Sequence, residues 1–362
     1  MTTIGIIGGG QLGQMLGYAG ATIDVECVFL EPTQDAPAST AGELLPYAYD
    51  DPKGLDELVT RAGAVTYEFE NVPVDSVRRI ANDVSVFPSA QALEAAQDRL
   101  YEKRLFRELD IPTPEFHAVD SLAALERAAE ELGFPFVLKT RRLGYDGKGQ
   151  AVIRGTADLG PAWDELGAVP LLAEAWIAFD FEVSMIGARN VREETAYYPL
   201  TQNDHEDGIL RTSRAPAGDA ELTAVAKDYH SRLSARLDYV GVLALELFVS
   251  GDQLIANEVA PRVHNSGHWT IEGTASSQFE NHLRAVSGMP LGETRALGFA
   301  AMENLIGTLP RNLDEIRRRG FYVHDYGKAP RPGRKLGHIT LLATSEAERE
   351  EKLAELGHYL RA

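Results

Sequence analysis

The chain begins with TIGIIGGGQLGQML, in which Gly8, Gly10 and Gly13 stand between a β-branched run and a helical run. This G-x-G-x-x-G pattern is typical of the first turn of a dinucleotide-binding fold, because glycines let a helix N-terminus approach a ligand closely. Strand-like and helix-like segments then alternate up to about residue 90. The pattern predicts a doubly wound α/β domain whose strand ends share one crevice.

After residue 90 the pattern of expected helices and strands changes, which predicts further domains. A single long helix is expected over residues 91–110, and the prolines of IPTPEF mark a joint after it. Short helices then separate longer β segments, several arranged as hairpins, which indicates an antiparallel α+β body. We predict an N-terminal domain over 1–98, a body over 99–295 with a subdomain near 113–175, and a small C-terminal domain over 296–362.

The charge balance limits the classes of partner. The chain has 35 basic and 54 acidic residues, a formal net charge of −19. Nonspecific nucleic-acid binding is not expected, since it needs clustered basic side chains. No segment reaches the ~20 apolar residues of a membrane span and none resembles a signal peptide, so we expect a cytoplasmic protein. The single cysteine, Cys27, lies in an apolar run and is predicted to be a core residue.

A glycine-rich loop between two expected strands is the first candidate binding feature. In VLKTRRLGYDGKGQAVI, Lys139 ends the first strand, and Gly144, Gly147 and Gly149 punctuate the loop. Glycines allow positive φ and let backbone N–H groups approach phosphate oxygens, while lysines and arginines supply positive charge. We interpret the loop as a flap over a phosphate ligand; the alternative is a mobile hairpin with solvated basic side chains.

Two glutamates interrupt apolar strands in the segment VGVLALELFVSGDQLIANEVAPRVHNSGHW. Glu246 and Glu258 are expected on neighbouring strands of one hairpin, where their oxygens suit Mg²⁺. Buried carboxylates are costly without a cation, which favours this interpretation over two exposed side chains. Arg262 and His264 follow at once and are candidates for holding a small oxyanion or transition-state charge.

Two weaker candidates remain. The loop GKAPRPGRKLGH carries Lys328, Arg331, Arg334 and Lys335 in an otherwise acidic chain. A rigid basic loop can dock a phosphate monoester, and a solvated basic turn explains it almost equally well. By its position alone, the segment LLAEAWIAFDFEVS could offer backbone groups to an adenine edge and a carboxylate to a ribose.

The strings GYDGKGQ, EVAPRVHNSGHWT and RPGRKLGH together resemble the ATP-grasp superfamily and, within it, the N5-carboxyaminoimidazole ribonucleotide synthetases of purine biosynthesis. The resemblance implies a pre-ATP-grasp domain that binds no dinucleotide, an ATP-grasp body of two sheet-containing subdomains, and a small C-terminal domain. It implies ATP-dependent carboxylation of 5-aminoimidazole ribonucleotide by bicarbonate, through carboxyphosphate, in a homodimer. Relatives often have Gly-Gly-Tyr-Asp-Gly in the flap; Leu143 replaces the first of these glycines here, which we expect to stiffen the loop.

The resemblance also implies roles for individual residues. The residues that would contact ATP are Arg99, Lys139, Gly144, Tyr145, Asp146, Gly147, Lys148, Gly149, Gln150, Glu174, Ala175, Trp176, Ile177, Glu182, His205, Asn257 and Glu258. The ligands of Mg²⁺, or of Mn²⁺, would be Glu246 and Glu258. The residues that would contact the ribonucleotide are Gln11, Leu12, Glu70, Tyr145, Asn265, Ser266, Lys328, Arg334 and Lys335. The catalytic residues would be Asp146, Arg262, His264 and Lys335.

Three alternatives stay open. Another ATP-grasp ligase, such as a formate-dependent glycinamide ribonucleotide transformylase or a biotin carboxylase, would share the phosphate chemistry and differ in acceptor. An NAD-dependent oxidoreductase is supported by the glycine loop and by Glu31, which ends the second expected strand where a ribose-binding acid belongs. That interpretation leaves Glu246, Glu258 and the flap unexplained. A nucleotide sensor without catalysis would not need the metal and oxyanion candidates.

Overall fold

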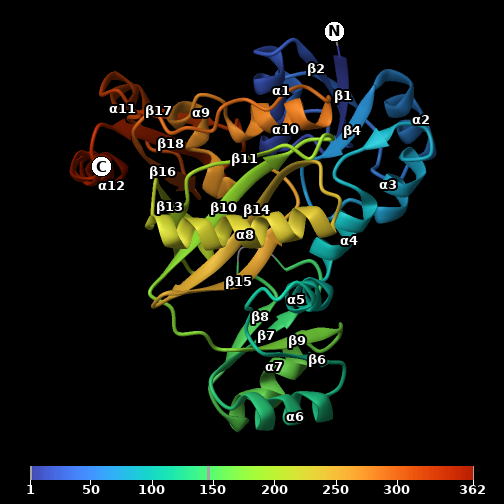
Figure 1. Cartoon of the computed structure of the whole chain (residues 1–362), viewed down its shortest axis with the longest axis vertical. Coiled ribbons are helices and arrows are strands. Elements are labelled where there is room, and N and C mark those ends of the chain that lie inside the picture. Colours follow the sequence, from blue (N-terminus) through green and yellow to red (C-terminus); the bar gives the residue numbers. More distant parts are fainter. Residues whose placement is uncertain (1, 145–146, 362) are drawn as a thin grey trace.

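The computed structural model describes residues 2–144 and 147–361 (Figure 1). The N-terminal segment forms a parallel sheet in the order β3-β2-β1-β4-β5, so the α/β fold predicted from the glycine motif is confirmed. The short strand β3 was not apparent from the sequence pattern. The elements of this sheet are β1 (Thr2–Ile7), α1 (Gln11–Ala21), β2 (Val25–Leu30), the 3₁₀ turn η1 (Pro37–Thr40), β3 (Glu43–Leu45), α2 (Pro52–Arg61), β4 (Ala64–Tyr67), α3 (Val74–Ile80) and β5 (Ser85–Val86).

The single helix expected over residues 91–110 is wrong, because the helix breaks at Asp98. Asp98 is extended, with φ −129°, and separates α4 (Ala90–Gln97) from α5 (Arg99–Glu108). Its carboxylate accepts a backbone N–H of α5, as helix-capping aspartates do, and also accepts two guanidinium N–H groups of Arg141. Because Arg141 is distant in sequence, helical periodicity alone could not reveal the break.

A small antiparallel sheet, in the order β6-β9-β7-β8, forms the lower lobe in Figure 1. Helices α6 and α7 pack against it around an apolar cluster that includes Leu125, Phe136 and Leu171. The glycine-rich loop joins β7 to β8, as the sequence predicts for a flap between two strands. The elements are β6 (Phe116–Val119), α6 (Leu122–Leu132), β7 (Phe136–Thr140), β8 (Gln150–Ile153), η2 (Thr156–Asp158), α7 (Leu159–Leu166) and β9 (Leu171–Ala175).

The central antiparallel sheet runs β15-β14-β10-β12-β13-β16-β18-β17, with β11 paired to β10. The C-terminal strands continue this sheet through the pairing of β13 with β16, which the sequence pattern did not indicate. The strands are β10 (Phe181–Arg189), β11 (Thr195–Tyr197), β12 (Thr201–Glu206), β13 (Ile209–Ala215), β14 (Gly241–Ser250), β15 (Gln253–Ala260), β16 (Phe299–Ile306), β17 (Tyr322–Asp325) and β18 (Lys335–Ala343). The helices are α8 (Ala220–Arg236), η3 (Asn265–Gly267), α9 (Thr270–Gly273), α10 (Gln278–Val286), α11 (Leu313–Arg318) and α12 (Glu346–Arg361).

Helix α10 joins the parallel sheet to the central sheet, since it packs against both α1 and β14. Leu16 of α1, Val242 of β14, and Phe279 and Leu283 of α10 belong to one buried apolar cluster. This packing brings the carboxyl edge of the parallel sheet beside β15. Cys27 lies in the same cluster, and burial raises the pKa of its thiol to about 12, which confirms it as a core residue.

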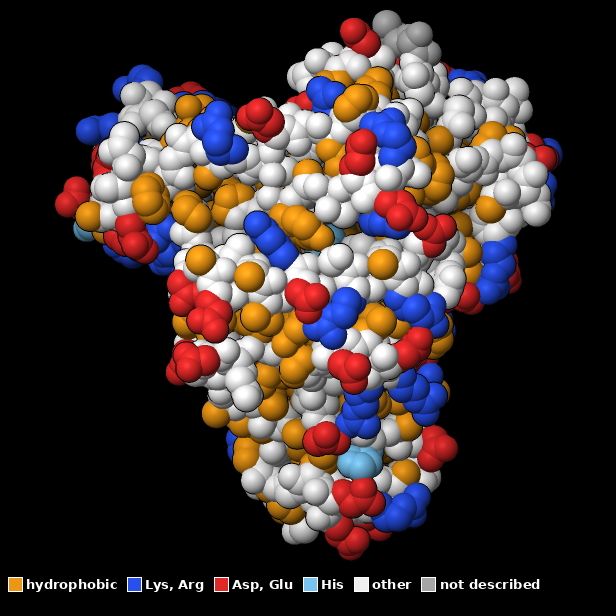
Figure 2. Space-filling model, in the orientation of Figure 1, with side chains coloured by type: hydrophobic (Ala, Val, Ile, Leu, Met, Phe, Trp, Pro, Cys, Tyr) orange, Lys and Arg blue, Asp and Glu red, His pale blue; other side chains and the backbone are white. Residues whose placement is uncertain are grey.

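The outline of the molecule has three lobes, and acidic and basic side chains are intermixed on the face shown in Figure 2. The lobes do not by themselves define domain boundaries, so the boundaries expected after residues 98 and 295 stay predictions. None of the helices in the described part of the chain combines the length and apolarity needed to span a bilayer.

Candidate active site

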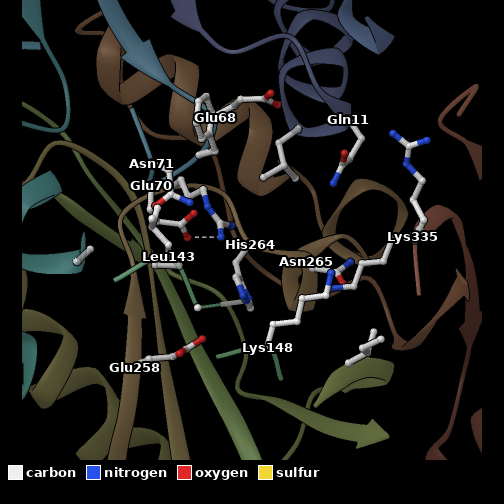
Figure 3. A pocket seen from close by; sticks show the side chains of 18 of the residues that line it. Gln11, Glu68, Glu70, Asn71, Leu143, Lys148, Glu258, His264, Asn265 and Lys335 are labelled. Carbon is white, nitrogen blue, oxygen red and sulfur yellow. Dashed lines mark hydrogen bonds and ion pairs between the residues drawn. The ribbon is translucent and has the colours of Figure 1, made fainter. Parts of the chain in front are cut away.

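A cavity of about 790 Å³ opens where the parallel sheet, the central sheet and the basic C-terminal loop meet (Figure 3). Its walls come from segments that are far apart in the sequence. The candidates from the sequence that line it are Gln11, Leu12, Glu70, Arg99, Gly144, Lys148, Glu258, Arg262, His264, Asn265, Lys328, Arg334 and Lys335. Lining residues that sequence reasoning had not proposed include Gln97, Glu102 and Tyr326.

The remaining candidates among the described residues lie outside the lining of this cavity. They are Lys139, Gly147, Gly149, Gln150, Glu174, Ala175, Trp176, Ile177, Glu182, His205, Glu246, Asn257 and Ser266. Two of their groups are described below, the carboxylates around Glu246 and the ion pair of Lys139. Tyr145 and Asp146, expected at the tip of the flap, lie outside the described residues.

The glycine loop at the start of the chain already binds carboxylates of the protein itself. The Gly9 N–H donates to Glu31 Oε2 at 3.0 Å, and the N–H groups of Gly10 and Gly13 donate to the two oxygens of Glu68. A Cβ at Gly10 would lie 2.7 Å from Glu68 Oε1, so this glycine makes room for the glutamate. The donors that bind a pyrophosphate in a dinucleotide-binding fold are therefore occupied, which opposes the NAD-dependent alternative.

Glu31, the acid that supported NAD binding, has a structural role instead. It is buried and accepts the Tyr49 O–H at 2.7 Å and the Thr33 N–H at 2.9 Å, besides the Gly9 N–H. These donors hold the strand end against the glycine loop. The carboxylate thus already accepts three hydrogen bonds from the protein itself, which opposes a role in binding a ribose hydroxyl.

The basic loop faces the glycine loop across the cavity. Lys328 Nζ donates to the side-chain oxygen of Gln11, which links this loop to the N-terminus of α1. Burial and the neighbouring Arg334 guanidinium lower the pKa of the Lys328 ammonium to about 8. Clustered cations that destabilise one another in this way favour a bound anion. This geometry supports a phosphate-docking loop over a solvated turn.

Arg262 and His264 lie deeper in the cavity. Arg262 forms an ion pair with Glu70, while its buried Nε has no hydrogen-bond partner among the described residues. His264 Nδ1 accepts the Ser266 backbone N–H at 3.3 Å, which leaves the proton on Nε2, 3.3 Å from Glu246 Oε1. Burial and the positive charge of Arg262 hold the pKa of His264 well below its usual range. The imidazole is therefore a neutral donor.

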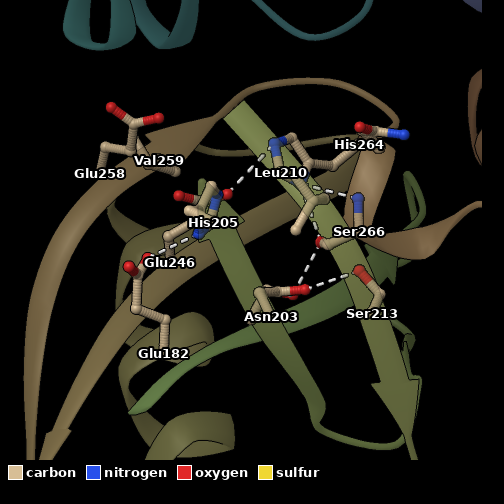
Figure 4. A network of polar contacts seen from close by, with 12 residues as sticks. Glu182, Asn203, His205, Leu210, Ser213, Glu246, Glu258, Val259, His264 and Ser266 are labelled. Carbon is tan, nitrogen blue, oxygen red and sulfur yellow. Dashed lines mark hydrogen bonds and ion pairs between the residues drawn. The ribbon is translucent and has the colours of Figure 1, made fainter. Parts of the chain in front are cut away.

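Ser266, expected among the substrate contacts, is buried behind His264. Its Oγ lies 2.8 Å from His264 Nδ1 and 2.7 Å from Ser184 Oγ, at the end of a polar chain that continues through Asn203 to Ser213 (Figure 4). This chain orients the imidazole ring and does not face the cavity.

Glu246 on β14 and Glu258 on β15 lie directly opposite each other, as predicted for one hairpin. The pairing shifts beside them: Leu247 pairs with Ala256, so Asn257 is an extra residue. Such a β-bulge re-aims the next side chain. Burial first, and then the Glu258 carboxylate, raise the pKa of Glu246 to about 8. The protein's own groups therefore compensate poorly for the negative charge of these two carboxylates.

A divalent cation fits these carboxylates. Glu182, His205 and Glu246 each bring a donor atom within 4.8 Å of the others (Figure 4), and Glu258 is the strand partner of Glu246. His205 Nδ1 lies 3.2 Å from Glu182 Oε2. Carboxylate oxygens are the ligands that Mg²⁺ prefers, and a cation would offset the cost of burying Glu246.

Glu174, a candidate ATP contact, forms an ion pair with Lys139. Its Oε2 lies 2.8 Å from Lys139 Nζ and 3.7 Å from Lys103 Nζ. Burial opposes ionisation of Glu174, yet these ammonium groups hold its pKa down at about 2. The carboxylate therefore positions Lys139. Sequence reasoning missed Lys103, although its spacing of three residues from Leu100 and from Phe106 places it on the buried stripe of α5.

Leu143, which replaces a flap glycine, has a φ of +63°. This left-handed conformation costs a residue with a side chain about 1–2 kcal/mol, because its Cβ crowds the backbone. The side chain itself is 72% exposed, so packing does not offset the strain. The substitution therefore strains the flap as well as removing a glycine.

Three family models match consecutive parts of the chain. They are the Ribonucleotide synthetase preATP-grasp domain over residues 1–97, the ATP-grasp domain over 104–279, and the Phosphoribosylaminoimidazole carboxylase C-terminal domain over 300–352. The first match covers the parallel sheet, the second covers the small sheet and β10–β15 of the central sheet, and the third covers the strands β16–β18 that continue the central sheet.

Individual relatives agree with these models. The N5-carboxyaminoimidazole ribonucleotide synthase of Pseudomonas aeruginosa is 48% identical over 359 residues, which cover 99% of each chain. The crystal structure of the Thermus thermophilus synthetase is 48% identical, covers 98% of each chain and superposes with a TM-score of 0.94. That of the Aspergillus clavatus synthase in complex with ADP and 5-aminoimidazole ribonucleotide is 28% identical, covers 99% of this chain and 98% of its own, and has a TM-score of 0.89. The chain belongs to the N5-carboxyaminoimidazole ribonucleotide synthase family of ATP-grasp enzymes.

Proposed function

We propose that this protein carboxylates 5-aminoimidazole ribonucleotide with bicarbonate at the expense of ATP, and releases N5-carboxyaminoimidazole ribonucleotide, ADP and phosphate. The observation that carries the proposal is the cavity itself, whose lining includes the basic side chains Lys328, Arg334 and Lys335 and the Glu258 carboxylate. Figure 3 shows Lys335 and Glu258 on different sides of the cavity. A ribonucleotide phosphate suits the basic end, and a metal-bound nucleotide suits the carboxylate end. The Aspergillus clavatus relative binds both kinds of ligand, ADP and 5-aminoimidazole ribonucleotide.

ATP is assigned to the carboxylate end and the flap. Lys139 and Lys148 would bring positive charge to its phosphates, and Arg99, with Nη2 3.7 Å from Glu258 Oε2, would join them. Mg²⁺, or Mn²⁺, held by Glu246 and Glu258, would neutralise the charge of the β- and γ-phosphates. The other assigned contacts are the chain at 175–177 with the adenine, and Glu182 with the ribose beside His205.

The ribonucleotide is assigned to the opposite end. Its phosphate would bind Lys328, Arg334 and Lys335, and its ring would lie near Gln11 and Glu70. The bond from Lys328 to Gln11 holds this wall in place before a substrate arrives. Preorganised donors of this kind reduce the cost of ordering on binding.

The chemistry follows from the weakness of bicarbonate as an electrophile. Transfer of the γ-phosphoryl group from ATP gives carboxyphosphate, in which phosphate is a good leaving group. The 5-amino group then forms the N–C bond of the carbamate, while phosphate leaves and the amine loses a proton. Arg262 and the Nε2–H of His264 are proposed to hold the oxyanion, since a neutral imidazole can donate without first gaining a proton. Asp146 is proposed to orient the amine or accept its proton.

The test measures ADP release while 5-aminoimidazole ribonucleotide and bicarbonate are varied independently. We expect release to require both compounds, and replacing bicarbonate with formate to abolish it. Release that ignores the ribonucleotide would overturn the proposal. Release that needs formate and glycinamide ribonucleotide would instead establish the transformylase alternative.

A homodimer and a cytoplasmic location complete the proposal, and both rest on the family resemblance. Sedimentation velocity at micromolar concentration is expected to give a species of twice the chain mass. Cell fractionation is expected to recover the activity in the cytosol. A monomer, or activity in a membrane or secreted fraction, would contradict the corresponding assignment.

A further inference from the structure

Helix α5 places two consecutive charged residues inside the protein, beneath the carboxylate end of the cavity. Glu102 is 3% exposed and Lys103 is 1% exposed. Residues of this kind are almost never buried without partners, because removing a charge from water is costly. The groups that Glu102 and Lys103 contact therefore indicate the role of these two buried residues.

Both residues bind the backbone of the β-bulge beside Glu258. Lys103 Nζ donates to the Asn257 carbonyl at 2.6 Å, and Glu102 Oε1 accepts the Val259 N–H at 2.6 Å. That carbonyl belongs to the peptide bond before Glu258, and that N–H to the peptide bond after it. The two side chains thus hold the residue from both sides, at the point where the ladder between β14 and β15 is irregular.

Lys103 also reaches the other face of the nucleotide site. Its Nζ lies 3.7 Å from Glu174 Oε2, and the same oxygen accepts the Lys139 ammonium at 2.8 Å. Glu258 and Lys139 belong to different sheets, and α5 contacts the partners of both. One helical turn therefore links the carboxylate that would bind a cation to the ammonium that would bind a phosphate.

We propose that Glu102 and Lys103 are positioning residues, which set Glu258 opposite Glu246 and hold Lys139 in register with them. The inference rests on the proposed function, in that it takes these groups as the cation and phosphate ligands. Partners behind a metal ligand typically change metal affinity by roughly 10–100-fold when removed. A buried ion pair that only stabilises the fold would lack this effect.

The test compares Glu102→Gln with Glu102→Met. Neither replacement can ionise, but only glutamine keeps an oxygen that can accept the Val259 N–H. Calorimetry would measure binding of a non-hydrolysable ATP analogue in Mg²⁺ and again in EDTA. We expect Glu102→Met to weaken binding about tenfold in Mg²⁺ and little in EDTA, and Glu102→Gln to stay near the wild type.

Leu105→Ala is the matched control, since Leu105 lies on the same helix in an apolar cluster. It should lower the melting temperature and leave the ratio of the two dissociation constants unchanged. If Glu102→Met, Glu102→Gln and Leu105→Ala all leave that ratio unchanged, the positioning role is overturned.

Lys103→Met should weaken binding in both conditions, because it releases Glu174 and Lys139 as well as the bulge. If the Lys103→Met protein does not fold, the comparison of Glu102→Met with Glu102→Gln tests the positioning role by itself. The wild type could release ADP without 5-aminoimidazole ribonucleotide while Glu102→Met and Glu102→Gln still differ in their affinity for the ATP analogue in Mg²⁺. In that case the proposed function fails and the positioning role stands.

Discussion

Glu68 offers a sharp test of what holds the opening glycine loop in shape. Its carboxylate is 7% exposed and accepts the N–H groups of both Gly10 and Gly13. Leaving a buried donor unsatisfied costs about 1–3 kcal/mol, so Glu68→Ala should lower the free energy of unfolding by roughly 2–6 kcal/mol. Glu68→Gln keeps one acceptor oxygen and should lose about half as much.

Urea unfolding followed by circular dichroism measures these differences. Glu26→Ala is the control, because Glu26 is exposed on β2 and its replacement should change stability by less than about 0.5 kcal/mol. Gln11 lies between the two glycines, so a displaced loop should also raise the KM for 5-aminoimidazole ribonucleotide. If Glu68→Ala is as stable as Glu26→Ala, the loop does not depend on this carboxylate and our account of the glycine motif is wrong.

Three further predictions concern the site and the core. Glu258→Gln should reduce ADP formation to background, and normal release would remove Glu258 as a cation ligand. Arg334→Ala should raise the KM for the ribonucleotide roughly 10–100-fold and leave that for ATP unchanged, as initial rates would show. Burial lowers the pKa of His230 and of His282 to about 4, below the unfolded value of about 6.5. The unfolded state therefore binds more protons, and urea titrations should show stability that is complete above about pH 6.5 and falls by roughly 2 kcal/mol per histidine at about pH 5. The variant His282→Gln should lose about 2 kcal/mol less than the wild type over the same pH range.

Local patterns in the sequence determined which segments form helices, strands and loops. Glycine spacing and apolar periodicity predicted the parallel sheet, the flap between two strands, and the hairpin that carries Glu246 and Glu258. These features depend on residues close together in the chain, where strand and helix periods specify which side chains share a face. The family was likewise readable, because its motifs are short continuous strings.

The tertiary structure alone decided what those segments do to one another. The glycine motif predicted an open anion site, and only the packing of β4 beside the loop showed that Glu68 fills it. The pairing of Asp98 with Arg141, and the contact of Lys103 with the backbone beside Glu258, likewise join distant segments. Each of these contacts joins residues more than about 40 positions apart, so its energy comes from burial and charge pairing that no local period records.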